Sequence, residues 1–240
     1  MNNLVIETTS PRPVKIQVKG LVKTFRTNGV MVEVLTGVDL DIFQGETLAI
    51  AGASGVGKST LLHILGTLER PTAGQVLWDE ADVFSLEEKP LAAFRNRKVG
   101  FVFQLHHLLP EFNVLENVMM PALIARLPQS AAREMAEAIL LRVGLKDRLR
   151  HRVSLISGGE QQRVAVARAL VLNPEVLLAD EPTGNLDPRS GARVHELILE
   201  LNRELGLTSV IVTHNLELAR SLDRQITLMD GKAVGMRGSA

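Results

Sequence analysis

The sequence has no cysteine, no long apolar run and no excess of charge of either sign. Without cysteine the chain can form neither disulfide bonds nor thiolate metal sites, which fits a reducing compartment. No stretch approaches the ~20 apolar residues that a membrane helix requires, so any work at a membrane would be done through a partner. Lysine plus arginine and aspartate plus glutamate both number 27, so no basic surplus indicates a nucleic-acid partner.

The length of 240 residues fits one α/β domain, which we place at residues 13–238. The first residues are polar and carry no apolar segment of the kind found in a signal peptide. We therefore expect residues 1–12 to be a disordered lead.

A glycine-rich stretch between a short apolar run and a helical pattern is the strongest motif in the chain. Residues 48–51 are apolar, and residues 52–59 follow the pattern G-x-x-x-x-G-K-S. Glycines let backbone N–H groups approach an anion, the lysine reaches phosphate oxygens, and the serine hydroxyl suits Mg²⁺. A glycine-rich turn that contains Lys-Ser by chance fits this strand-to-helix context less well. The sequence predicts a nucleoside triphosphate site at Gly52, Ser54, Gly55, Gly57, Lys58, Ser59 and Thr60.

Polar side chains follow three further strand-like runs. Asp180 and Glu181 come directly after the apolar residues 176–179, Gln104 follows residues 99–103, and His214 follows residues 209–213. Ligands bind at the carboxyl ends of parallel strands, so these groups should meet the phosphate loop. Asp180 would hold Mg²⁺, Glu181 would polarise the attacking water, and Gln104 and His214 would sense the γ-phosphate. An acidic helix cap and an ordinary surface histidine are the structural alternatives.

The remaining pattern predicts an α/β fold with three parts. Residues 14–43, with a turn near residues 28–29, and residues 74–78 favour an antiparallel β layer. Residues 47–51, 176–179 and 209–213 are buried strands of a mainly parallel sheet. Residues 105–157 form an inserted helical subdomain, in which Ser130 caps a helix that stops at Gly144. Asp187-Pro188 should start a helix that ends at Gly206.

A second anion-binding helix start is predicted at Ser157, Gly158, Gly159 and Glu160, before a helix over residues 161–172. One nucleotide already has its phosphate loop. The second helix start therefore predicts a twofold dimer in which each copy completes the nucleotide site of the other.

With these motifs in this order, the sequence resembles the ATP-binding subunit of an ABC transporter over nearly its whole length. The resemblance implies a P-loop ATPase core that binds ATP and Mg²⁺. In it, Glu181 would be the catalytic carboxylate and His214 the switch histidine. Ser59, Gln104 and Asp180 would lie near the metal. It implies that Ser157, Gly158, Gly159 and Glu160 contact the partner protomer's γ-phosphate. Phe25 stands where the family often has an adenine-stacking tyrosine.

A narrower resemblance connects the chain with lipoprotein-releasing (Lol-type) ATP-binding subunits, through residues 104–112, 115–121 and 183–187. It implies two transmembrane permease subunits as partners, docked on the segment after Gln104, and a place at the cytoplasmic face of the bacterial inner membrane. The alternatives are an ATPase subunit of a macrolide or peptide efflux or cell-division complex, and a soluble ABC-type ATPase acting on DNA or ribosomes. The neutral charge disfavours the last, and no nucleic-acid partner is expected.

Overall fold

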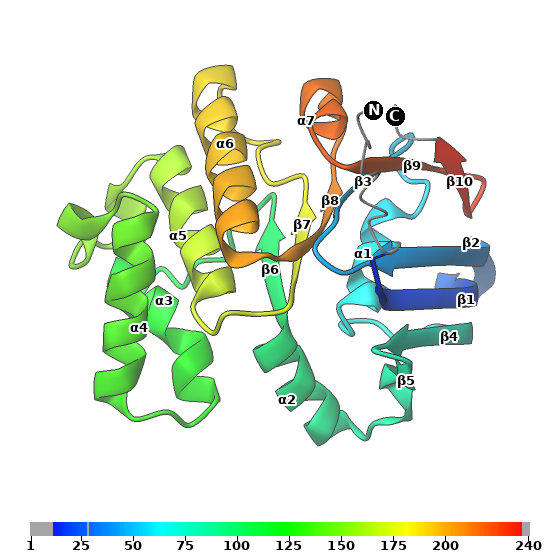
Figure 1. Cartoon of the computed structure of the whole chain (residues 1–240), viewed down its shortest axis with the longest axis horizontal. Coiled ribbons are helices and arrows are strands. Elements are labelled where there is room, and N and C mark those ends of the chain that lie inside the picture. Colours follow the sequence, from blue (N-terminus) through cyan, green and yellow to red (C-terminus); the bar gives the residue numbers. More distant parts are fainter. Residues whose placement is uncertain (1–11, 28, 237–240) are drawn as a thin grey trace, which may run out of the picture.

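The computed structural model describes residues 12–27 and 29–236, and a parallel sheet lies at its centre (Figure 1). Six strands follow the order β10-β9-β3-β8-β7-β6, and all pairs except β9 with β10 are parallel. The strands are β3 (Thr47–Ala51), β6 (Val99–Phe103), β7 (Val176–Asp180), β8 (Thr208–Val212), β9 (Arg224–Met229) and β10 (Lys232–Met236). Since both faces of β3, β7 and β8 are buried, their side chains show no polar alternation, as predicted.

An antiparallel sheet with the order β2-β1-β4-β5 forms the second layer. Its strands are β1 (Val14–Thr27), β2 (Val30–Phe43), β4 (Ala73–Trp78) and β5 (Ala81–Asp82). The predicted antiparallel β layer is confirmed, although residue 28 of its predicted turn lies outside the described residues. Ile16 and Ile42 pack with Ile50 and Leu61 in one core, which joins this sheet to the central one. Trp78 is also part of this core, and its indole N–H donates to the Leu65 carbonyl oxygen at 3.2 Å.

Seven α-helices surround the sheets in the described residues. They are α1 (Lys58–Leu65), α2 (Glu88–Lys98), α3 (Val114–Ile124), α4 (Gln129–Arg142), α5 (Gly158–Leu170), α6 (Pro188–Leu205) and α7 (Leu216–Arg220). Short 3₁₀ turns occur at Val83–Ser85, Lys146–Arg148 and Val153–Leu155. In the part of the chain that the structure describes, no helix combines the length and the apolar character needed to cross a bilayer.

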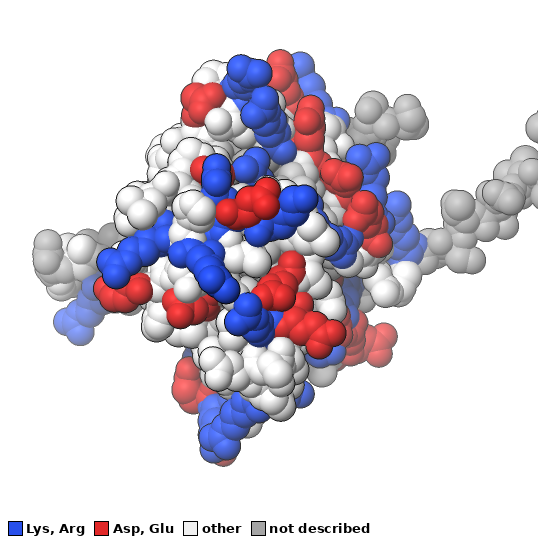
Figure 2. All heavy atoms as spheres, turned by 90° about the vertical axis from the view of Figure 1, so that its left-hand side faces the viewer, with Lys and Arg blue, Asp and Glu red and all other residues white. Residues whose placement is uncertain are grey.

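Helices α3, α4 and α5 pack together at one end of the molecule, on the left of Figure 1. This group contains the predicted helical insertion, and α5, which starts after residue 157, packs against it. Seen from this end, Lys and Arg side chains lie interspersed with Asp and Glu (Figure 2). The surface therefore shows mixed charge here, as the neutral composition suggested.

The predicted starts of α4 and α5 are wrong, and both predicted boundaries of α6 are confirmed. Helix α4 starts at Gln129, after Pro128 at the N-cap with no capping side chain, so Ser130 is not the cap. Proline has no backbone N–H, so at the N-cap it leaves one donor fewer to be satisfied at the helix start. Helix α5 covers residues 158–170 instead of 161–172, because Ser157 caps it directly. As predicted, Asp187 caps α6 through the Ser190 amide, and α6 ends at Gly206, whose φ is 61°.

Candidate functional site

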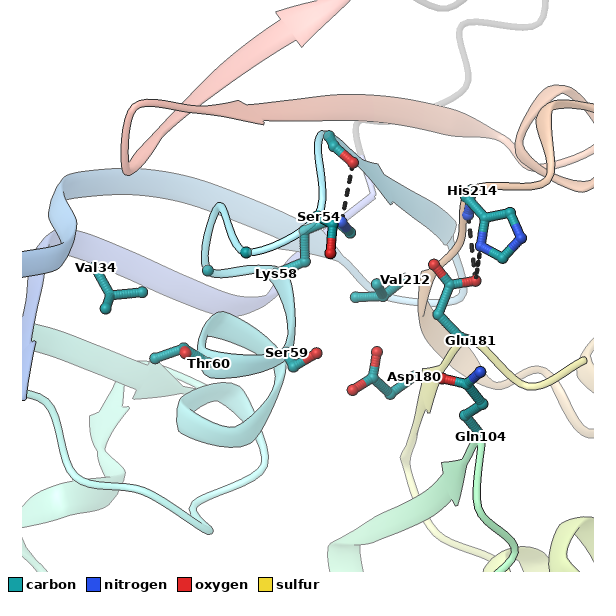
Figure 3. A pocket seen from close by; sticks show the side chains of 13 residues that line it. Val34, Ser54, Lys58, Ser59, Thr60, Gln104, Asp180, Glu181, Val212 and His214 are labelled. Carbon is teal, nitrogen blue, oxygen red and sulfur yellow. Dashed lines mark hydrogen bonds and ion pairs between the residues drawn. The ribbon is translucent and has the colours of Figure 1, made fainter. Parts of the chain in front are cut away.

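A pocket of about 580 Å³ opens where the parallel strands end (Figure 3). The chain leaves β3 into the glycine-rich loop, β6 into Gln104, β7 into Glu181 and β8 into His214. These segments are far apart in sequence, and the parallel topology brings their ends to one edge. The lining residues are Val34, Gly52, Ser54, Gly55, Gly57, Lys58, Ser59, Thr60, Gln104, Asp180, Glu181, Val212 and His214.

The glycine-rich loop wraps the start of α1 and needs glycine at two positions. Gly52 has a φ of 146°, and a Cβ there would lie 2.6 Å from the Leu228 carbonyl oxygen. Gly57 has a φ of 102° and serves as the N-cap of α1. The Lys58 ammonium donates to the carbonyl oxygens of Gly52 at 2.9 Å and Ala53 at 2.8 Å. The loop thus presents backbone donors and a cation to an anion at the helix N-terminus.

Glu181 contacts Val212 and His214 and has an uncommon backbone conformation. Its φ is 46°, in the left-handed region, and its N–H donates to the Val212 carbonyl oxygen at 2.9 Å. Its carboxylate lies 2.8 Å from His214 Nδ1 and accepts from the His214 backbone N–H at 3.3 Å (Figure 3). The Glu181 side chain is 17% exposed, whereas that of His214 is 73% exposed. A fixed carboxylate at the pocket edge can act as a general base toward a water molecule.

Gln104 is tied to the loop that follows Glu181. Its side-chain amide donates to Asn185 Oδ1 at 2.9 Å, and the Asn185 amide donates to the Gln104 carbonyl oxygen at 3.2 Å. Gln104 and Asp180 line the same pocket as Ser59 (Figure 3). The three side chains predicted to meet the metal therefore face one cavity, and each offers an oxygen ligand.

The predicted second anion-binding segment lies elsewhere. Ser157, Gly159 and Glu160 line a separate pocket of about 290 Å³ with Ser190 and Arg193. Ser157 caps α5, and the Glu160 carboxylate accepts from the Ser157 N–H and hydroxyl, both at 2.8 Å. These bonds, and the 2.9 Å ion pair with Arg148, hold the pKa of Glu160 at about 2. The Glu160 carboxylate therefore bonds to Ser157 at the start of its own helix and to Arg148.

Phe25 is the other predicted site residue that does not line the main pocket. It lies on β1 opposite Val32, with the Lys23 ammonium 4.7 Å from the centre of its ring. Sequence reasoning in turn missed two apolar walls of the pocket, Val34 and Val212. Valine in a strand is ordinary, so only the sheet arrangement could have identified these two positions.

Comparison with known proteins agrees with this geometry. The ABC transporter family matches residues 35–184. The chain is similar to the lipoprotein-releasing system ATP-binding protein LolD of Syntrophus aciditrophicus, at 58% identity over 91% of this chain and 98% of that protein. LolD of Myxococcus xanthus is 54% identical to the chain, over 90% of this chain and 97% of that protein.

Solved structures give the same result. The dimeric structure of MJ0796, a bacterial ABC transporter cassette, matches with a TM-score of 0.84 and 39% identity, over 93% of this chain and all of that one. A post-hydrolysis state of the same cassette, bound to ADP and Pi, has the same TM-score and coverage at 38% identity. The family match to more than half of the sequence, the similarity to LolD proteins and the fold show that the chain belongs to the ABC transporter family, as one of its ATP-binding, ATP-hydrolysing subunits.

Proposed function

We propose that this chain powers the release of lipoproteins from the bacterial inner membrane, working peripherally at its cytoplasmic face. The observation that carries the proposal is the match to lipoprotein-releasing relatives, which spans nearly the whole of both chains. The nucleotide pocket supports it, because the acyl chains of a lipoprotein bind the bilayer favourably and their removal needs an energy source.

ATP would bind with its phosphates in the loop of residues 52–60. Lys58 would exchange its two carbonyl contacts for the β- and γ-phosphate oxygens, a charge-assisted interaction that carbonyl groups cannot match. The remaining contacts would come from backbone N–H groups at the start of α1. Phe25 does not line the phosphate pocket, and its ring would stack on the adenine instead.

The site also suits Mg²⁺. Ser59, Gln104 and Asp180 offer hydroxyl, amide and carboxylate oxygens to one cavity, which is the hard donor set that this ion prefers. In the described residues no cluster of three acidic or histidine side chains forms a metal cage. This fits an ion that is held partly by phosphate oxygens. When bound, Mg²⁺ would neutralise charge on the β- and γ-phosphates.

Hydrolysis would depend on Glu181 as the base that polarises the attacking water. His214 would hold the carboxylate through the 2.8 Å contact and reach the γ-phosphate, since most of its side chain is exposed at the pocket. Gln104 would orient the water with a neutral amide. The three are predicted catalytic groups, and their place on one pocket supports these roles.

The nucleotide would lie between two copies of the chain. Ser157, Gly158, Gly159 and Glu160 are the predicted γ-phosphate contacts. None of them lines the pocket of Lys58, and all but Gly158 line a separate one. A second copy can bring its own α5 N-terminus to the nucleotide of the first. The dimeric form of the similar cassette supports this arrangement.

Two transmembrane permease subunits would dock on an apolar groove beside Gln104. The groove, of about 390 Å³, lies between α2, β6, α3 and α5, and its walls include Phe101, Phe103, Pro121 and Ile124. Two large apolar side chains of this groove are exposed, Ile124 by 67% and Leu68 by 45%, and adjoining exposed apolar groups suit a covered surface. The segment from Gln104 to α3 would pass the partner's movement to the catalytic pocket.

The test is extraction of the tagged chain from its native membranes in mild detergent, followed by mass identification of the co-purifying proteins. Two membrane subunits with bound lipoprotein would support the proposal. A different membrane partner, such as an efflux or cell-division protein, would refute lipoprotein as the cargo and leave the ATPase mechanism unchanged. Recovery in the soluble fraction alone, or with nucleic acid, would refute a role in transport.

A further inference from the structure

A partly buried histidine outside the catalytic set contacts the loop that carries the catalytic carboxylate. His195 lies on α6, and its Nε2 is 2.5 Å from the Thr183 hydroxyl oxygen. Burial lowers the pKa of His195, which keeps the ring neutral near neutral pH. A neutral imidazole can accept the hydroxyl proton or donate its own, so either tautomer makes this bond.

Thr183 stands in the middle of the short loop between β7 and α6. The Gly184 N–H donates to the Glu181 carbonyl oxygen at 3.0 Å, and the Leu186 N–H donates to the Thr183 carbonyl oxygen at 3.1 Å. The same loop holds Glu181 at one side of Thr183 and Asn185, the partner of Gln104, at the other. A shift of Thr183 would therefore move Glu181 directly, and Gln104 through Asn185, relative to the phosphate loop.

This loop has open space on the side of the His195 contact. A cavity of about 310 Å³ lies between the loop, the start of α6 and the segment after β8, and Glu181, Thr183 and His195 all line it. A loop beside a cavity makes fewer packing contacts, because the missing atoms give none. The hydrogen bond from Thr183 to His195 ties the middle of the loop to α6.

We propose that His195 is a positioning residue for ATP hydrolysis: through Thr183 it fixes the loop that places Glu181 and Asn185. The inference rests on the proposed role of Glu181 as the base. His195 would not touch the nucleotide, so it should affect the rate of the chemical step and leave nucleotide affinity unchanged.

The test measures kcat and KM for ATP with the full chain. Replacement His195→Phe keeps the ring volume and removes the bond; we expect kcat to fall roughly five- to tenfold, as loss of one neutral hydrogen bond at a positioned group would give, at constant KM. His195→Gln can place an amide nitrogen near the former Nε2 and should recover most of the rate. Thr183→Val should match His195→Phe, and the double variant should be no slower than either single one.

Two controls separate the possible outcomes. Ile198→Val, on the buried side of the same helix, lowers stability without touching Thr183; a comparable fall in kcat would overturn the proposal in favour of a purely structural role. Glu181→Gln gives the reference rate for a missing base. If Glu181→Gln abolishes hydrolysis while His195→Phe retains the wild-type kcat, only the His195 inference fails. If Glu181→Gln is as fast as wild type, the proposed base itself is refuted.

Discussion

A single methyl group at position 184 would test how strongly hydrolysis depends on the placement of Gln104. Gly184 has no positive φ, so alanine can adopt its backbone conformation. The added Cβ would lie 2.8 Å from Gln104 Nε2 and 3.1 Å from its Cδ. Both distances are too short for carbon, and the Gln104 amide, at the end of an exposed flexible side chain, is the group that will move.

The displaced amide loses its 2.9 Å bond to Asn185. Because both side chains are exposed, this bond contributes roughly 0.5–1 kcal/mol, the lower part of the range for neutral hydrogen bonds. If that energy holds Gln104 in its working position, kcat should fall about two- to fivefold. The stability of the fold should change by less than about 0.5 kcal/mol, since no buried atom has to shift.

The assay compares Gly184→Ala, Gln104→Ala and the double variant, with kcat from steady-state hydrolysis and stability from urea unfolding. In the Gln104→Ala background the added methyl meets no amide, so it should have no further effect on the rate. An equal loss in both backgrounds would refute the reasoning, because the methyl would then act on something other than Gln104.

Three further outcomes are expected. Glu181→Gln should bind Mg-ATP, stall hydrolysis and accumulate as a dimer in size-exclusion chromatography; a monomer in saturating Mg-ATP would contradict the sandwich. Lys58→Ala should weaken ATP binding in calorimetry by roughly ten- to a hundredfold, as loss of a charge-assisted bond predicts, and an unchanged affinity would rule out its assigned role. The pKa of Glu160 is about 2 in the folded chain against 4.5 ordinarily, so its contribution to stability is complete above about pH 4.5 and is lost as the pH falls toward 2. The unfolding free energy of Glu160→Gln should therefore fall less steeply over that acid range, and equal slopes would contradict this.

The catalytic pocket could be predicted because each polar group follows an apolar run directly. Asp180 ends β7, Glu181 follows it and His214 lies just beyond β8, so the topology of a parallel sheet alone places them together. The glycines of the phosphate loop directly indicate a backbone conformation that other residues rarely adopt. At these positions the local sequence and the overall fold predict the same arrangement.

The sequence was less informative where the outcome depends on a competing local contact. Ser130 is a good capping residue, but Pro128 starts α4 earlier. The sequence also did not indicate that the Glu160 carboxylate would bond to Ser157 and Arg148. The bond between Thr183 and His195 joins residues 12 positions apart across a turn and a helix, and no spacing rule indicates it.

The left-handed backbone of Glu181 has a consequence for the evolution of this chain. A glutamate at a φ of 46° raises the energy of the folded state by about 1–2 kcal/mol relative to glycine, which adopts that conformation freely. An inactive descendant that acquired glycine here would relax this strain, although glycine's more flexible unfolded state would offset part of the gain. With Glu181 as the proposed base, selection for stability and selection for turnover act in opposite directions at this position.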